Sequence, residues 1–141
     1  MQVFVPYAEP IEVAQTLDAR RLHRQIVECC QILDAIDGKT DGWKNHPVIK
    51  MYAPYREWLD RYRLCLREWW AGEDASARWW SHHADNVRPP FLTEEFCKQH
   101  KRRLYTKDPE KYSQFASLGY SEENWYFIDG EIVKYLGGKR I

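Results

Sequence analysis

Residues 17–33 read LDARRLHRQIVECCQIL, and this amphipathic stretch decides the fold. At about 100° per residue its apolar side chains fall on one stripe of a helix, namely Leu22, Ile26, Cys29, Leu33 and Ile36. The opposite face carries one acid, Glu28, among Arg20, Arg21, Arg24, Gln25 and Gln31. Nearby positive charge keeps a carboxylate ionised, and the arginines leave the face net positive. Such a face suits an anionic polymer, although a merely solvated helix face with an Arg24–Glu28 pair explains the same pattern.

Composition limits the class of protein. The chain has 141 residues, of which 44% are hydrophobic, so we expect one folded domain over residues 1–141. The formal net charge is zero, which argues against a protein that binds polyanions through bulk charge. A local basic surface is still expected, because lysines and arginines cluster at residues 20–24 and 98–107.

The cysteines and the apolar runs indicate where such a protein works. Its four cysteines show no paired spacing, which favours reduced thiols in a cytoplasmic protein. No apolar run approaches the roughly 18 residues of a membrane span, and the first ten residues lack the pattern of a signal peptide. We therefore expect a cytoplasmic protein without membrane contact. We also expect a monomer, although these features leave the oligomeric state open.

The rest of the chain predicts further helices and little strand. Residues 1–7 are expected to form an extended arm that leads into a helical turn at 11–17. Helices are predicted over about 54–70 and, with Thr93 as N-cap, over about 93–105. Asp129-Gly130 is typical of a tight hairpin turn. The predicted fold is all-α, a compact single-domain bundle of about three main helices with long loops. A small C-terminal hairpin is compatible with this prediction.

Two further segments carry candidate ligand-binding residues. The loop at residues 38–52 has donors for phosphates or bases beside Trp43, namely Lys44, Asn45, His46 and Lys50. An ordinary surface loop has a similar composition. The second segment is the basic cluster at residues 98–107, which supplies Lys101, Arg103 and Lys107. By contrast, His82 and His83 lack further residues at zinc-ligand spacing, so we expect no metal site.

Three strings together resemble a known enzyme family. The order of leucine, arginine pair, leucine and glutamate in residues 17–28 resembles the catalytic helix of the pyrimidine-dimer DNA glycosylases of the phage endonuclease V type. The strings GWKNHP at 42–47 and HKRRLYTKDPEKYSQF at 100–115 are similar to segments of bacterial members. The resemblance implies a DNA glycosylase with abasic-site lyase activity on pyrimidine dimers or another bulky or modified pyrimidine. It also implies an all-α fold, a reaction that needs no cofactor, and a protein that acts in a bacterial or phage-infected cell.

The resemblance also implies roles for individual residues. The family's nucleophile is the terminal α-amine, whose ordinary pKa of about 8 leaves a useful neutral fraction. Here that amine belongs to Met1, or to Gln2 if Met1 is removed, and Glu28 is the essential acid. The family's aromatic tail, which holds the damaged bases, is similar to Trp125, Tyr126, Tyr135 and Lys139. Contacts to damaged or modified double-stranded DNA are expected from Arg20, Arg21, Arg24, Gln25, Lys44, Asn45, His46, Lys50, Lys101, Arg103 and Lys107.

Two other classes of protein stay open on the sequence. A non-catalytic DNA-binding module on the same scaffold would bind DNA without nicking it. A protein-interaction domain would use exposed aromatic residues, which make up 15% of the chain, and would show no affinity for DNA.

Overall fold

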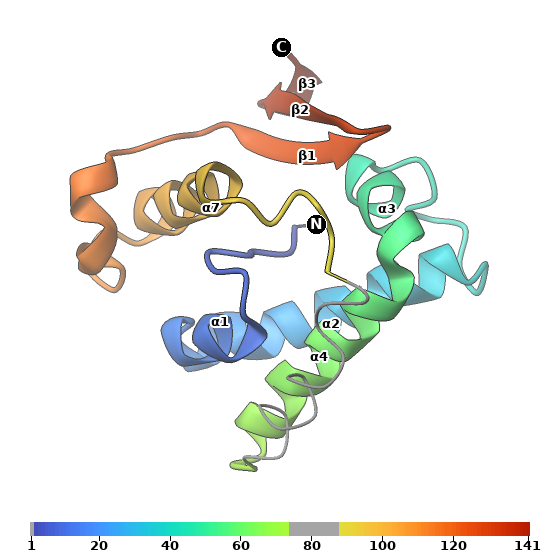
Figure 1. Cartoon of the computed structure of the whole chain (residues 1–141), viewed down its shortest axis with the longest axis horizontal. Coiled ribbons are helices and arrows are strands. Elements are labelled where there is room, and N and C mark those ends of the chain that lie inside the picture. The colour runs from blue at the N-terminus through green and yellow to red at the C-terminus, as the bar shows by residue number, and fades with distance from the viewer. Residues whose placement is uncertain (1, 74–87) are drawn as a thin grey trace.

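The computed structural model describes residues 2–73 and 88–141 and combines helices with a small sheet (Figure 1). The described helices are α1 (Pro10–Thr16), α2 (Ala19–Ile36), α3 (Pro47–Tyr52), α4 (Arg56–Trp70) and α7 (Glu94–Lys107). Short 3₁₀ helices lie at Ala53–Tyr55 and Ser113–Leu118. The strands are β1 (Asn124–Ile128), β2 (Glu131–Leu136) and β3 (Lys139–Arg140). The interpretation of His82 and His83 falls outside the described residues.

Helix α2 closely follows the helix predicted over residues 17–33. Asp18 lies before it as the N-cap, and its carboxylate accepts a hydrogen bond from the Arg21 backbone N–H at 3.4 Å. The apolar stripe is buried at Leu22, Cys29 and Leu33. It packs against α4, which crosses α2 in Figure 1. This pair of helices forms the floor of the molecule.

The N-terminal arm is buried among helices, as its apolar sequence predicts. Residues 3–5 are at most 8% exposed. Because the arm belongs to no sheet, its backbone groups need hydrogen-bond partners other than a strand. They find them in the side chains of Gln25 on α2, Tyr62 on α4 and His100 on α7. The arm is therefore part of the core and leads directly into α1.

The C-terminal strands form an antiparallel sheet in the order β1-β2-β3. Strand β1 contacts α3 and α7, and Figure 1 shows the sheet lying across them. Tyr126, at the centre of β1, is buried on the core side. Asp129 and Gly130 connect β1 to β2 with φ of 53° and 80°, and Gly137 and Gly138 connect β2 to β3 with φ of 59° and 82°. Two-residue hairpin turns of this kind require positive φ at both positions.

The expectation of an all-α fold is therefore wrong, since helices and an antiparallel sheet occur together. The predicted turn at Asp129-Gly130 is present between β1 and β2, and a third strand, which was not predicted from the sequence, follows. Strand β1 reads Asn-Trp-Tyr-Phe-Ile, a nearly continuous aromatic run. Such a run lacks the alternation of polar and apolar residues by which a strand is recognised in sequence.

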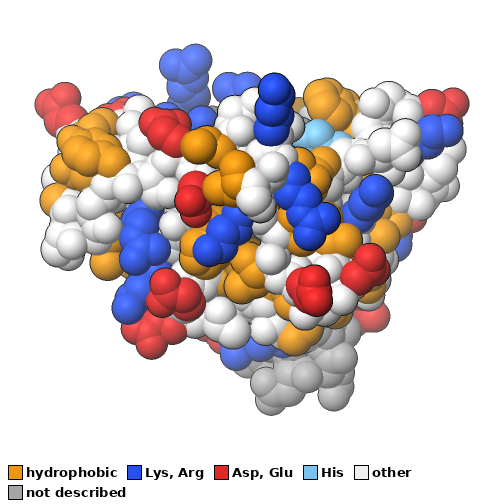
Figure 2. All heavy atoms as spheres, turned by 90° about the horizontal axis from the view of Figure 1, so that it is seen from above, with side chains coloured by type: hydrophobic (Ala, Val, Ile, Leu, Met, Phe, Trp, Pro, Cys, Tyr) orange, Lys and Arg blue, Asp and Glu red, His pale blue; other side chains and the backbone are white. Residues whose placement is uncertain are grey.

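The surface carries charges of both signs. Figure 2 shows Lys and Arg side chains interspersed with Asp and Glu on the face seen from above, in line with the formal net charge of zero. A region that binds anions must therefore be local. None of the helices within residues 2–73 and 88–141 is long and apolar enough to cross a membrane.

Candidate functional site

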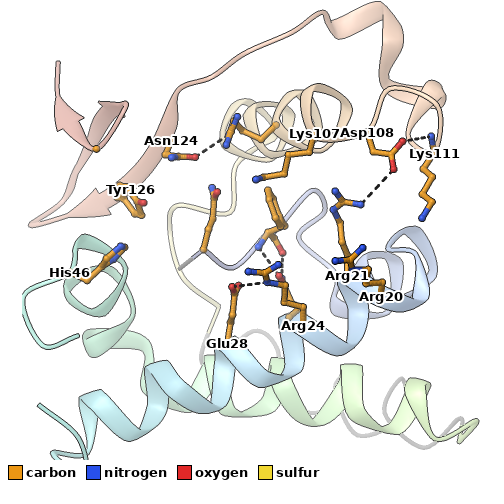
Figure 3. Close-up of a pocket in the computed structure, with 15 residues that line it drawn as sticks. Arg20, Arg21, Arg24, Glu28, His46, Lys107, Asp108, Lys111, Asn124 and Tyr126 are labelled. Atoms are coloured by element: carbon orange, nitrogen blue, oxygen red, sulfur yellow. Dashed lines mark hydrogen bonds and ion pairs between the residues drawn. The ribbon is translucent and has the colours of Figure 1, made fainter. Parts of the chain in front are cut away.

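A cleft of about 560 Å³ opens between α2 and the elements above it (Figure 3). Helix α2 forms its lower wall, and the end of α7 with strand β1 forms its upper wall. The arm and the loop before α3 contribute residues between these walls. The cleft is lined by Gln2, Phe4, Arg20, Arg21, Arg24, Gln25, Glu28, His46, Arg103, Lys107, Asp108, Lys111, Asn124, Tyr126 and Gly138.

Glu28 projects from α2 into this cleft (Figure 3). Its side chain is 18% exposed, and its Oε1 atom lies 3.6 Å from Nε of Arg24, one turn earlier on the helix. Arg24 is open to solvent, with a side chain that is 73% exposed. The acid is thus largely shielded, while the cation beside it remains accessible to an anionic ligand.

Cations from α2 and from the end of α7 surround one end of the cleft, and Arg21 is the most constrained of them. Its Nη1 atom lies 3.3 Å from Oδ1 of Asp18 and 3.9 Å from Oδ2 of Asp108. Its guanidinium carbon lies 5.5 Å from the centre of the Tyr112 ring. Two carboxylates and the Tyr112 ring therefore hold the guanidinium of Arg21 in a fixed position beside the cleft. The other cations at this end are Arg20, Lys107 and Lys111.

The pKa of Lys107 reflects how closely positive charges approach one another here. Burial lowers this pKa from its ordinary value, and the charges of Arg103, Arg21 and Arg24 lower it further. A bound phosphate would relieve the repulsion, because an opposite charge favours the protonated amine. This end of the cleft consequently has the electrostatics of an anion site.

The opposite end of the cleft is aromatic. His46 precedes α3, and its Nδ1 atom accepts a hydrogen bond from the Val48 backbone N–H at 3.1 Å. Burial lowers the pKa of His46, so at neutral pH the ring carries its single hydrogen on Nε2. The Tyr126 ring lies 6.1 Å from the His46 ring at 82°, and the Trp43 ring lies 5.7 Å from it. Aromatic faces with a nearby donor are suited to hold a nucleobase.

Many of the predicted functional residues meet in this cleft. Among the predicted catalytic residues, Gln2 and Glu28 both line it, whereas Met1 lies outside the described residues. The start of the described chain and the acid therefore share one cavity. The predicted DNA contacts that line the cleft are Arg20, Arg21, Arg24, Gln25, His46, Arg103 and Lys107.

The remaining predicted DNA contacts do not line the cleft. Lys44, Asn45 and Lys50 are exposed on the loop and on α3. Lys101 lies on another side of α7, where its Nζ atom is 4.3 Å from the centre of the Tyr7 ring. The assignment of these residues as DNA contacts stays a prediction.

Gln25 and Arg103 line the cleft but are held by bonds within the protein. Gln25 is 2% exposed, and its amide bonds with the backbone of Phe4 and the hydroxyl of Tyr62. Arg103 is 7% exposed, and its Nε donates to Oδ1 of Asn124 at 3.0 Å. These two residues shape the walls of the cleft, and their contact with DNA likewise stays a prediction.

Several lining residues were not among the predicted site residues. Asp108 and Lys111 follow Lys107 within the string at 100–115, so their closeness in sequence to a predicted contact was a usable signal. Asn124 and Gly138 come from the sheet, whose position against α7 is a long-range feature that no local pattern reports. Tyr126, named from the aromatic tail, does line the cleft.

The cleft offers a defined set of chemical groups. Within residues 2–73 and 88–141, no group of three or more His, Cys, Asp or Glu side chains is placed to hold a metal ion. What the cleft provides is Glu28 beside cations, aromatic rings at the far end, and the start of the described chain. Such a set can bind phosphates, hold a flat base and support proton transfer at a sugar.

A family model described as pyrimidine dimer DNA glycosylase matches residues 1–71. This range contains the arm, α1, α2, α3 and α4, and with them Glu28 and His46. No curated protein and no solved structure matches the chain. The matched range is half of the 141 residues and includes the acid with the arginines around it, so the chain belongs to the pyrimidine dimer DNA glycosylase family.

Proposed function

We propose that the protein removes damaged pyrimidines from duplex DNA and then cleaves the strand at the abasic site, with the amine at the start of the mature chain as nucleophile. The observation that supports this most is that Gln2 and Glu28 line the same cleft. A terminal amine suits the task because its ordinary pKa of about 8, unlike that of lysine, leaves a neutral fraction at physiological pH. The amine belongs to Met1, or to Gln2 once Met1 is removed.

The proposed reaction begins with a substitution at the sugar. The amine nitrogen forms a bond to C1′ as the glycosidic bond breaks, and the base leaves with the electron pair and takes up a proton. Loss of the amine proton and opening of the sugar ring give an imine between chain and sugar. Loss of a proton from C2′ then breaks the C3′–O bond, so that the 3′ phosphate leaves. Water finally hydrolyses the imine, which restores the free amine of the protein and leaves the sugar as an aldehyde on the DNA.

Glu28 carries the proton transfers in this proposal. Positive charge develops on the sugar as the base departs, and a carboxylate at that point stabilises it. The same carboxylate can accept the amine proton and later assist the elimination. Its place in the cleft supports this role, since the side chain is largely shielded from water and Arg24 lies 3.6 Å away.

The two ends of the cleft hold different parts of the DNA. Arg20, Arg21, Arg24, Lys107 and Lys111 bind the phosphates beside the target nucleotide and fix its position. His46 and Tyr126 receive a base that has left the stack. Extrusion costs about a few kcal/mol and is easiest at a damaged pair, which favours lesions over intact DNA.

Borohydride trapping tests the proposed nucleophile, because reduction makes an imine permanent. The protein is incubated with an ultraviolet-irradiated duplex and with the same duplex undamaged, then reduced, digested and mapped by mass spectrometry. We expect an adduct on the terminal residue with the irradiated duplex alone. An adduct on a lysine would overturn the role of the terminal amine. Binding without any adduct or nick would overturn the enzymatic proposal and favour a non-catalytic DNA-binding module.

A duplex with a preformed abasic site separates the two activities. It bypasses the glycosylase step, so trapping on it reports the lyase step alone. Trapping on the abasic duplex without trapping on the irradiated one would contradict action on dimers and leave the lyase step intact.

A further inference from the structure

The arm before α1 is fixed by side chains from three helices. The Phe4 N–H donates to Oε1 of Gln25 at 3.1 Å, and the Phe4 carbonyl accepts from Nε2 of Gln25 at 2.6 Å and from the Tyr62 hydroxyl at 2.7 Å. The Val5 N–H donates to Nδ1 of His100 at 2.9 Å. Side chains thus do for the arm what a neighbouring strand does in a sheet.

These bonds lie in the core of the protein. Gln25 and His100 are each 2% exposed, and Tyr62 is 0% exposed. Since little water can replace a lost partner here, a shift of the arm would leave buried donors and acceptors unsatisfied. The Gln25 amide both donates to and accepts from Phe4, so it fixes the rotation of the arm as well as its position.

The chemistry of His100 fits the bond that it makes. Burial lowers the pKa of His100 to about 3, so the ring stays neutral at ordinary pH and the lone pair on Nδ1 remains available. Lysine or arginine could not accept this bond. The other ring nitrogen, Nε2, is buried and has no partner in the described part of the chain.

We infer that Gln25, Tyr62 and His100 are positioning residues, which hold Phe4 and Val5 so that the start of the chain enters the cleft beside Glu28. This inference rests on the proposed role of the terminal amine. Gln25 lies three positions before Glu28, so one turn of α2 carries both the glutamine that bonds with Phe4 and the acid. Each residue before Phe4 extends the chain by at most about 3.6 Å, so fixing Phe4 confines the amine to the neighbourhood of the acid.

The first test compares two buried glutamines. Gln25→Met removes the bonds to Phe4 and keeps a side chain of similar length. Gln99→Met is the matched control, because Gln99 is also 2% exposed and its amide donates to Ser121 and to the Glu123 carbonyl, both at 2.8 Å. With saturating abasic duplex, we expect borohydride trapping to slow about 10- to 100-fold in Gln25→Met and to change less than about twofold in Gln99→Met. Affinity for the duplex is measured in both variants, and saturation with duplex keeps a change in affinity from entering the trapping rate.

The second test asks whether a conservative residue rescues the rate. His100→Asn can place an amide oxygen near the position of Nδ1, whereas His100→Phe keeps a ring without an acceptor. We expect His100→Asn to trap faster than His100→Phe at equal affinity for the duplex. Urea unfolding of both variants is measured alongside the trapping rates. A purely structural role of His100 would lower the stability of both variants without making His100→Asn trap faster than His100→Phe.

The outcomes separate this inference from the proposed function. If the wild type forms an adduct and Gln25→Met traps as fast as Gln99→Met, the positioning role is overturned and the proposed function stands. If the wild type forms no adduct, the proposed function is overturned and the positioning role with it. Should Gln25→Met fail to fold, the two His100 variants decide, and equal trapping rates in that pair would overturn the inference.

Discussion

Two basic runs that look alike in the sequence behave differently in the folded chain. The run at residues 20–24 lies on α2, and the run at residues 101–103 lies on α7. On α2 the basic side chains line the cleft, and that of Arg24 is 73% exposed. On α7, Arg103 is 7% exposed and donates to Asn124. The arginines of the α2 run line the cleft, whereas the α7 run is engaged mainly by other parts of the protein, with Lys101 over Tyr7 and Arg103 bonded to Asn124.

The difference shows that positive charge in a sequence is not the same as positive charge available to a ligand. A guanidinium that donates to the protein itself has fewer N–H groups left for a phosphate. Arg102 is a further case on α7, since its Nε donates to the Leu118 carbonyl at 3.2 Å. The α2 run has fewer such internal partners and is the better candidate for contact with DNA.

Glu28→Gln is expected to have the largest effect, because it removes the acid at the centre of the α2 face and keeps its shape. We expect strand cleavage of an irradiated duplex to fall about 10²- to 10⁴-fold, while affinity for the duplex is retained. Gel analysis of cleavage and fluorescence anisotropy measure the two quantities. Glu95→Gln on α7, where Glu95 lies 4.0 Å from Arg102, is the matched control and should cleave normally. Unchanged cleavage by Glu28→Gln would refute the role of this acid.

Arg103→Met probes the basic run on α7, and here the expected effect is on the stability of the protein. It leaves Asn124 without its donor and removes the bond to the Ser121 carbonyl at 3.1 Å, so the free energy of unfolding should fall by about 2 kcal/mol. Arg24→Met on α2 should change it by less than about 0.5 kcal/mol, since that side chain is mostly exposed. Urea unfolding measures both variants. Equal losses in the two would remove the distinction between the runs.

The salt dependence of DNA binding probes the basic run on α2. Arg20→Gln should lower the slope of log Kd against log salt concentration by about one, because one phosphate contact is lost. Lys101→Gln should leave the slope unchanged, since Lys101 packs over Tyr7 and does not line the cleft. Titrations of a duplex at several salt concentrations give the slopes. A lower slope in Lys101→Gln would mean that the α7 run also contacts DNA.

The smallest effect concerns Asp18, whose carboxylate pairs with Arg21 at the start of α2. Burial raises the pKa of Asp18, but hydrogen bonds from Tyr112 and Arg21 outweigh burial and lower it overall. Stability from such a carboxyl is complete above its unfolded pKa of about 4 and is lost as the pH falls through the folded value. Asp18→Asn keeps an N-cap but cannot titrate.

Urea unfolding at about pH 5 and about pH 3 tests the role of Asp18. The wild type should lose more stability than Asp18→Asn between these values, by less than about 1 kcal/mol. Equal losses would show that the carboxyl of Asp18 contributes nothing through its charge.

Features that depend on local patterns can be predicted from this sequence. The apolar spacing of α2 predicts a buried stripe, and Leu22, Cys29 and Leu33 are buried. Thr93 predicts the start of α7, and its hydroxyl accepts from the Phe96 N–H at 3.3 Å. In each case the residues that decide the outcome lie within a few positions of one another.

Features that depend on distant segments could not be predicted in the same way. Gln25 lies on the polar face of α2, yet the arm covers it and its amide bonds with Phe4, a burial that helical spacing does not predict. Its contact with DNA stays a prediction. Arg103 lies in a basic run, yet it is buried and donates to Asn124 on β1, a partner that the run itself does not predict. Its contact with DNA stays a prediction. Helical periodicity describes one element and cannot say what packs on it.

The bonds that close the cleft also fix when it can form during synthesis. Tyr112 contacts Asp18 across 94 positions, and His100 holds Val5 across 95. Such distant partners meet late in folding, because long loops must close first. The arm at residues 3–5 is synthesised before its partner His100 on α7 and before the upper wall of the cleft. A chain synthesised only through α4 carries Glu28 and its arginines without the opposite wall, so the acid lies in a formed cleft only after α7 and β1 have also been made.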